Sequence, residues 1–276
     1  MHHLNILEYK RYRYLKAAFL LAVVSILAYV LHRPAIGPNG GTWLGYTLGV
    51  IGTLIIFWLL WFGIRKRRYR GVGSLHGWLS AHVYLGGALI IVVTLHTGFQ
   101  FGWNVHTLAY VLMMAVIISG FYGIYTYLRF PRLMTENIGE DSLEVLLLKI
   151  AELDELARHN ALQLSDEINE IVLKSSRETR IGGSALQQLS ANQQDCPTSA
   201  AVMKLRDLDK NLEGDQPKHH RELYLIMLRK EALVARARRD VMYKAQLEFW
   251  LYFHVPLSIG LIAALVAHIT SIAFYW

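Results

Sequence analysis

Two pairs of histidines with equal spacing stand out in this sequence, because both lie inside strongly apolar stretches. His82 and His96 form one pair, His254 and His268 form the other, and 14 residues separate the members of each. At about 100° per residue, such a separation comes within about 40° of four full helical turns, so both members share one helix face, about 21 Å apart. An imidazole inside a bilayer is costly and usually functional.

Two helices that face each other at equal depth would turn these pairs into two ligand sites. His82 would oppose His254 (the inner pair), and His96 would oppose His268 (the outer pair). Neutral imidazole is a ligand for haem iron, so each pair fits one haem, and the two haems would stack. Two ligands per iron favour electron transfer over oxygen chemistry. The alternative for such histidines is ordinary hydrogen bonding between helices.

The elements that must position these histidines are five apolar stretches, each close to the ~20 residues that a helix needs to cross a bilayer. They cover residues 16–33, 43–64, 78–101, 105–128 and 249–275. The expected fold is an all-α integral membrane protein whose five transmembrane helices form a haem-binding bundle. Residues 1–132 hold helices one to four, residues 133–246 form a cytoplasmic helical insertion, and residues 247–276 hold helix five.

The distribution of basic residues predicts the orientation of these helices. Lys and Arg cluster in residues 10–16 and 65–70, whereas the loops 34–42 and 102–104 contain neither. Because basic residues favour the cytoplasmic side, we expect a cytoplasmic N-terminus and a periplasmic C-terminus in the inner membrane of a bacterium. Helices three and five then run in the same direction. The inner histidines His82 and His254 therefore lie at one depth, and the outer histidines His96 and His268 lie at another.

The overall charge and the single cysteine exclude several classes of function. The formal net charge of +7 could indicate nucleic-acid binding. The basic residues outside 133–246 mostly flank apolar stretches, however, so we expect membrane lipid and no nucleic acid as a partner. Cys196 alone allows neither an intrachain disulfide nor the C-x-x-C-H attachment of covalent haem, so the cofactors would be two non-covalent haem b groups. Any iron–sulfur centre would belong to a partner.

The polar insertion has the patterns of helices. An apolar stripe at three- and four-residue intervals predicts an amphipathic helix; it comprises Leu143, Leu146, Ile150, Leu153 and Leu156. Ser165, followed by two acidic residues, predicts the start of a second helix. Residues 181–200 contain the Gly, Asn and Pro of a loop. From about residue 220, a basic helix is expected to run without a break into the fifth apolar stretch.

The sequences AHVYLGGALIIVVTLHTGF and FHVPLSIGLIAALVAHIT resemble the membrane cytochromes of the b type that hold two haems between two helices. This group includes the cytochrome b of quinol-oxidising complexes and the ferric-reductase-like membrane domains. The resemblance implies that His82 and His254 bind the inner haem iron and that His96 and His268 bind the outer one. The chain departs from the group in its insertion, and no flavin or nicotinamide domain is expected after Trp276.

The expected function is that of an electron-transfer subunit of a larger oxidoreductase. Electrons would cross the membrane between a quinone pool or a cytoplasmic redox partner and a periplasmic redox partner, without a catalytic residue in this chain. The expected partners are an iron–sulfur, flavin or c-type cytochrome protein, and quinone. The alternatives are a transporter that uses intramembrane histidines for metal ions or protons, and a sensor or scaffold that works through its insertion.

Several further residues bear on these sites. His106, near the end of its apolar stretch, could contact an outer haem propionate, line an outer substrate site, or only snorkel or cap a helix. Gly45, Gly49 and Gly52 follow one face of the second stretch, where glycine allows the close approach of a porphyrin or of another helix. Pro256, two residues after His254, would leave a backbone carbonyl without its amide partner.

Overall fold

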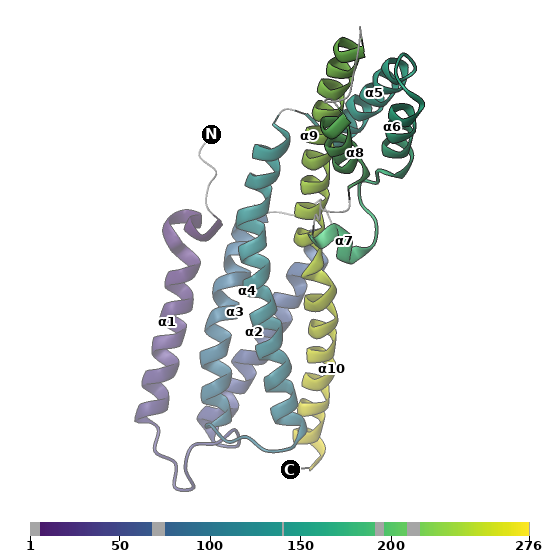
Figure 1. The fold of residues 1–276 in the computed structure, drawn as a ribbon. Helices are drawn as coiled ribbons and strands as arrows, with labels where there is room; N and C mark the ends of the chain where they lie inside the picture. Colours follow the sequence, from purple (N-terminus) through teal and green to yellow (C-terminus); the bar gives the residue numbers. More distant parts are fainter. Residues whose placement is uncertain (1–5, 68–74, 140, 191–195, 209–215, 276) are drawn as a thin grey trace. The chain divides into compact units, whose positions relative to one another are not determined.

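The structure is a computed structural model that describes residues 6–67, 75–139, 141–190, 196–208 and 216–275 (Figure 1). The described residues form helices and connecting loops, with no strand among them. The helices are η1 (Ile6–Glu8), α1 (Tyr9–Leu31), α2 (Trp43–Arg67), α3 (Leu75–Thr97), α4 (Val105–Ile138), α5 (Leu143–Ala161), α6 (Asp166–Glu178), α7 (Ala185–Ser190), α8 (Pro197–Leu208), α9 (Gln216–Phe249) and α10 (Leu251–Tyr275). Residues 68–70 of the basic cluster lie outside the described ranges.

The expected all-helical fold is confirmed, and so is the presence of five helices long and apolar enough to cross a membrane. α3 nevertheless ends at Thr97 rather than near residue 101. The reason is a sharp turn, because Gly98 and Phe99 both have positive φ angles, of 57° and 62°. A Cβ atom on Gly98 would lie 2.2 Å from the carbonyl oxygen of Pro38, so glycine is required where these two loops cross.

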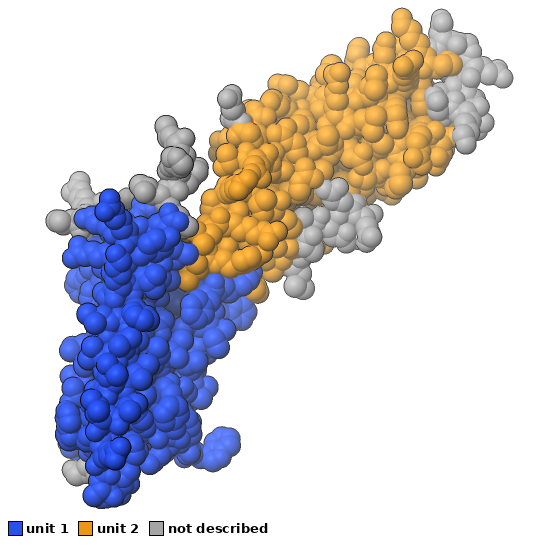
Figure 2. All heavy atoms as spheres, turned by 90° about the vertical axis from the view of Figure 1, so that its left-hand side faces the viewer, with its two compact units in different colours: residues 1–122, 251–276 blue, residues 123–250 orange. Residues whose placement is uncertain are grey.

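The chain divides into two compact units, shown in different colours in Figure 2. Unit 1 comprises residues 1–122 and 251–276, and unit 2 comprises residues 123–250. Unit 1 therefore contains α1, α2, α3, the first half of α4, and α10. All four histidines of the inner and outer pairs belong to it.

In unit 1, α2, α3, α4 and α10 meet in a central apolar layer. Its buried side chains are Ile56, Leu89, Met113, Leu261 and Leu265. α1 lies apart from this layer and packs with α2 and α3 through a second cluster, where Leu21 and Tyr29 contact the buried Leu48 and Val92. The histidines are thus carried by α3 and α10, two of the helices that share the central layer.

Unit 2 is a helical body in which α5, α6, α8 and α9 surround an apolar core. Its buried residues include Ala157, Ile168, Val172, Leu205 and Met227. The predicted helix start at Ser165 is confirmed, since Ser165 is the N-cap of α6. Leu156 was predicted to face the core and is 50% exposed, because the smaller Ala157 faces inward instead.

Two predictions about the insertion are wrong. The expected loop 181–200 contains α7 and the start of α8, in which Pro197 is the first helical residue. Proline is favoured at that position because its missing N–H has no partner to lose there. The basic helix does not continue without a break either, since α9 ends at Phe249 and α10 begins at Leu251. Pro256 weakens the first turn of α10, because it offers no N–H to the carbonyl four residues back.

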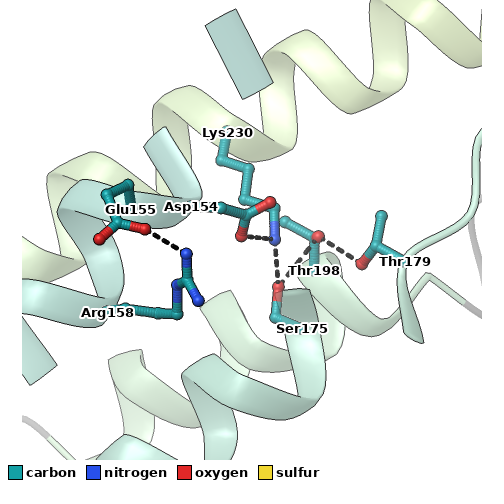
Figure 3. Close-up of polar contacts among 7 residues, drawn as sticks. All are labelled: Asp154, Glu155, Arg158, Ser175, Thr179, Thr198 and Lys230. Carbon is teal, nitrogen blue, oxygen red and sulfur yellow. Dashed lines mark hydrogen bonds and ion pairs between the residues drawn. The ribbon is translucent and has the colours of Figure 1, made fainter. Parts of the chain in front are cut away.

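Unit 2 also buries a charged side chain, Lys230, completely. Its ammonium group donates hydrogen bonds to Asp154 (2.6 Å) and to the hydroxyl of Ser175 (2.8 Å) (Figure 3). Ser175 and Thr179 both hydrogen-bond to the hydroxyl of Thr198. The network joins α5, α6, α8 and α9 through side chains that satisfy one another.

Candidate cofactor site

The inner and outer histidines lie on matching faces of α3 and α10. On α3, Leu89 lies seven residues after His82 and seven before His96. On α10, Leu261 holds the same position between His254 and His268. Both leucines belong to the central layer. Because the ring of His96 lies beside that of His268, the two helices run in parallel, with one histidine pair on each side of a packed apolar layer.

The outer pair is brought together directly. The ring centroids of His96 and His268 lie 6.0 Å apart, and the ring planes are nearly perpendicular, at 85°. Two imidazoles that bind one metal ion from opposite sides, at about 2.0–2.1 Å from each nitrogen, hold their ring centres roughly 6 Å apart. The separation of the outer pair thus fits an ion held between the rings.

The His96 ring is oriented by the backbone of α2. Its Nδ1 lies 2.7 Å from the carbonyl oxygen of Gly45, which can only accept a hydrogen bond. Nδ1 therefore carries the proton, and Nε2 has the lone pair that a metal ligand needs. The ring also lies against Gly49, where an added Cβ atom would be 2.7 Å from Cε1 of His96. Only glycine leaves room for this ring position.

The His268 ring is oriented by another histidine. Nδ1 of His106 and Nδ1 of His268 form a hydrogen bond, and the two ring centroids are 4.5 Å apart. His106 belongs to the first turn of α4, which is capped because the Thr107 amide donates to the Asn104 side chain (2.9 Å). One nitrogen of His268 is thus occupied by a neighbour, as is usual for a metal-binding histidine.

A cavity of about 460 Å³ opens between the helices at the outer pair. His96, His106 and His268 all line it, together with Gly49, Gly52, Tyr110 and apolar residues of the central layer. Its volume falls in the range of about 300–1,000 Å³ that is typical of ligand sites. No Asp, Glu, Lys or Arg lines the cavity among the described residues. Its walls therefore suit a largely apolar ligand that histidines hold.

The inner pair is less completely formed. Nδ1 of His254 lies 2.9 Å from the hydroxyl of Ser119, which itself donates to the carbonyl of Val116 (2.7 Å). The Ser119 oxygen therefore accepts the Nδ1 proton of His254, and this ring has the same tautomer as His96. His254 also lies against Gly120, whose added Cβ atom would be 3.5 Å from Cε1.

His82 differs from the other three histidines in its hydrogen bonding. Its Nδ1 is buried and has no hydrogen-bond partner in the part of the chain that the structure describes. The carbonyl of Leu59 lies nearby but outside hydrogen-bond geometry. The His82 ring lies 5.0 Å from that of Phe62, and it is within electrostatic range of His254. A buried nitrogen without a partner is costly, and only a group that bonds to Nδ1 itself would relieve that cost.

Sequence reasoning underrated two residues of this site. His106 was considered for the outer site but not as the partner of His268, and Ser119 was not considered at all. The available signal was a polar side chain inside an apolar stretch, which often bonds across helices. The direction in which each points depends on the rotation of α4, which the sequence pattern does not define.

Comparisons with known proteins add no identification. No family model, no curated protein and no solved structure matches this chain. Among the described residues, no group of three or more His, Cys, Asp or Glu side chains has the geometry of a metal-ion site. The functional argument therefore rests on the geometry of the histidines alone.

Proposed function

We propose that this protein is a membrane-embedded dihaem cytochrome of the b type that serves as an electron-transfer subunit. The observation that supports it best is the outer pair: two histidines from parallel helices, with ring centroids 6.0 Å apart, line one cavity. The hydrogen bond from His96 to Gly45 leaves Nε2 as the ligand nitrogen. His96 and His268 would hold the outer haem.

The inner haem would be held by His82 and His254. The Ser119 hydroxyl orients the His254 ring so that its Nε2 is available as a ligand, whereas Nδ1 of His82 has no hydrogen-bond partner among the described residues. When bound, each haem supplies iron that takes up and releases one electron. Two histidines per iron would leave it no open position, which limits the chemistry to electron transfer.

The proposed setting is a bacterial inner membrane. The five apolar helices would contact lipid, and the basic clusters favour a cytoplasmic N-terminus and a periplasmic C-terminus. In this arrangement the inner and outer pairs lie near opposite membrane surfaces. The redox partners would be a quinone pool or a cytoplasmic iron–sulfur or flavin protein on one side, and a periplasmic c-type cytochrome on the other.

An absorption spectrum of the purified protein tests this proposal. Protein from haem-replete cells is expected to show reduced b-type bands at two haems per chain. Replacing His96 by Ala should remove the outer haem and leave most of the inner one, because the central layer separates the two sites. His76→Ala is the matched control, since His76 is an exposed histidine at the start of the same helix. Colourless wild-type protein, or equal loss of both haems in a folded His96→Ala variant, would contradict the proposal.

The second candidate function is binding or transport of a transition-metal ion. One observation raises it, a third histidine, His106, beside His96 and His268, although the three side chains do not have the geometry of a metal-ion site. It is disfavoured by the absence of acidic residues among the described lining of the cavity, because carboxylates usually accompany such a path. Tight, stoichiometric binding of Zn²⁺ or Cu²⁺ by colourless protein, lost in His106→Ala, would support this candidate against the haem proposal.

A further inference from the structure

His106 has a more specific role than the sequence suggests. It occupies the second position of α4, and its ring meets that of His268 at a centroid distance of 4.5 Å and an angle of 87°. The ring centroid of His96 lies 6.0 Å from that of His268, and both residues line the cavity. His268 is thus placed between one histidine that hydrogen-bonds to its Nδ1 and another that faces it across the cavity.

We propose that His106 is the positioning residue of the outer site: it accepts the Nδ1 proton of His268 and so presents Nε2 of His268 as the metal ligand. This inference rests on the proposed haem function and adds a residue to it. A single hydrogen bond joins the two Nδ1 atoms, so one of them carries the proton and the other accepts it. If His268 carries it, Nε2 of His268 has its lone pair; if His106 carries it, Nε2 of His268 is protonated and cannot bind a metal ion.

The same kind of hydrogen bond orients His96 and His254, which supports this assignment. His96 gives its Nδ1 proton to the carbonyl of Gly45, and His254 gives its Nδ1 proton to the hydroxyl of Ser119. In each case an acceptor from a neighbouring helix selects the tautomer with a lone pair on Nε2. Among the described residues, no backbone carbonyl or hydroxyl takes this place at His268, and the acceptor is the His106 ring.

The position of His106 is well defined by the start of α4. The Asn104 side chain accepts the Thr107 amide, and the Thr107 hydroxyl accepts the Gly102 amide (3.1 Å). These bonds cap the helix and fix its first turn. The ring of His106 can therefore orient a neighbour although it is itself exposed.

The test compares two substitutions of His106 in the full chain, purified with its haem. His106→Leu removes the acceptor, and we expect roughly a 10- to 100-fold weaker affinity for the outer haem, as is usual for the loss of a bond to a metal-binding histidine. We also expect a higher reduction potential of that haem, because a ligand that donates no hydrogen bond gives less electron density to iron. The inner haem should be unchanged.

His106→Asn is the conservative variant, because Oδ1 of asparagine occupies nearly the same place as Nδ1 of histidine and can accept the same bond. It should restore the affinity, the potential and the electron paramagnetic resonance signal of the outer haem. His76→Leu serves as the control for replacing an exposed histidine at a helix start.

The outcomes separate this inference from the proposed function. Colourless wild-type protein would overturn both. Wild-type protein with two haems, together with His106→Leu that keeps the affinity, potential and resonance signal of the outer haem, would overturn only the role of His106. Retention of the outer haem in His268→Ala would also overturn the positioning role of His106. In that case His106 would be the metal ligand itself, not the residue that orients His268.

Discussion

The two units of this protein bury polar groups in different ways. In unit 2, Lys230 is fully buried, and Asp154 and Ser175 satisfy its charge at 2.6 and 2.8 Å. In unit 1, His96 and His268 are each held through Nδ1, and their rings border a cavity instead of closing on one another. A buried polar group with all its partners in place stabilises a fold, whereas one that faces a cavity has capacity left for a ligand.

The largest expected effect concerns the network of unit 2. Asp154→Ala removes the carboxylate beside Lys230 and leaves a buried ammonium group without its counter-charge. Such a loss costs about 3–5 kcal/mol of folding stability. Thermal unfolding of the full chain, followed by circular dichroism, should show an early transition of unit 2. The haem spectrum at low temperature should not change, because the network lies in unit 2 and the histidine pairs lie in unit 1.

A matched control lies beside this network. Glu155 forms an ion pair with Arg158 that is exposed to solvent (Figure 3), so Glu155→Ala should cost less than about 1 kcal/mol. A double variant, Asp154→Leu with Lys230→Met, removes both buried charges and should recover much of the loss. If Asp154→Ala and Glu155→Ala have the same stability, the buried pair has no structural role.

The next largest effect is expected where Gly49 leaves space for the His96 ring. Gly49→Ala places a Cβ atom 2.7 Å from Cε1 and 2.9 Å from Nδ1 of His96, so the ring must move from the position in which it donates to the Gly45 carbonyl. Overpacking of this kind costs about 1–3 kcal/mol. We expect weaker binding of the outer haem, measured by haem titration. Gly63→Ala, in the same helix, meets nothing within 4 Å and should bind haem as wild type does.

The sequence predicted the part of the site that depends on periodicity. The equal spacing of His82, His96, His254 and His268 implied matching faces on parallel helices, and α3 and α10 have this arrangement. The partners of the rings could not be predicted, because α4 is apolar on nearly every side and its rotation is set by packing. His106 and Ser119 acquire their contacts only through that rotation.

The errors in unit 2 have equally local causes. Pro197 belongs to a stretch interpreted as a loop, but proline also begins helices, and here it begins α8. The three- and four-residue spacing of the apolar stripe includes Leu156, yet the core of unit 2 takes the neighbouring Ala157. Apolar periodicity identifies a helix more reliably than it identifies the inward face, when small residues supply that face.

A smaller effect is expected at the inner pair. Ser119→Ala removes the acceptor for Nδ1 of His254 and should weaken the inner haem roughly tenfold. Ser258→Ala is the matched control, because the Ser258 hydroxyl donates to the backbone carbonyl of His254 (2.6 Å), not to its ring. Haem titration with the outer site intact measures the difference. Equal affinities in the two variants would show that the inner ring needs no partner to hold its orientation.

The smallest expected effect concerns Asp240, a buried residue of α9 whose Oδ1 has no hydrogen-bond partner among the described residues. Burial raises the pKa of the Asp240 carboxyl above its ordinary value of 3.8, and Lys244 offsets part of this. The folded state then holds the proton more tightly than the unfolded state, so stability falls as the pH rises from about 4 through the folded pKa. The penalty is complete once the pH lies above the folded pKa. Asp240→Asn should remove it, with a gain below about 1 kcal/mol at pH 7 that disappears at and below pH 4. Thermal unfolding of the full chain at both pH values measures this difference, and a gain that persists at pH 4 would assign the effect to packing instead of charge.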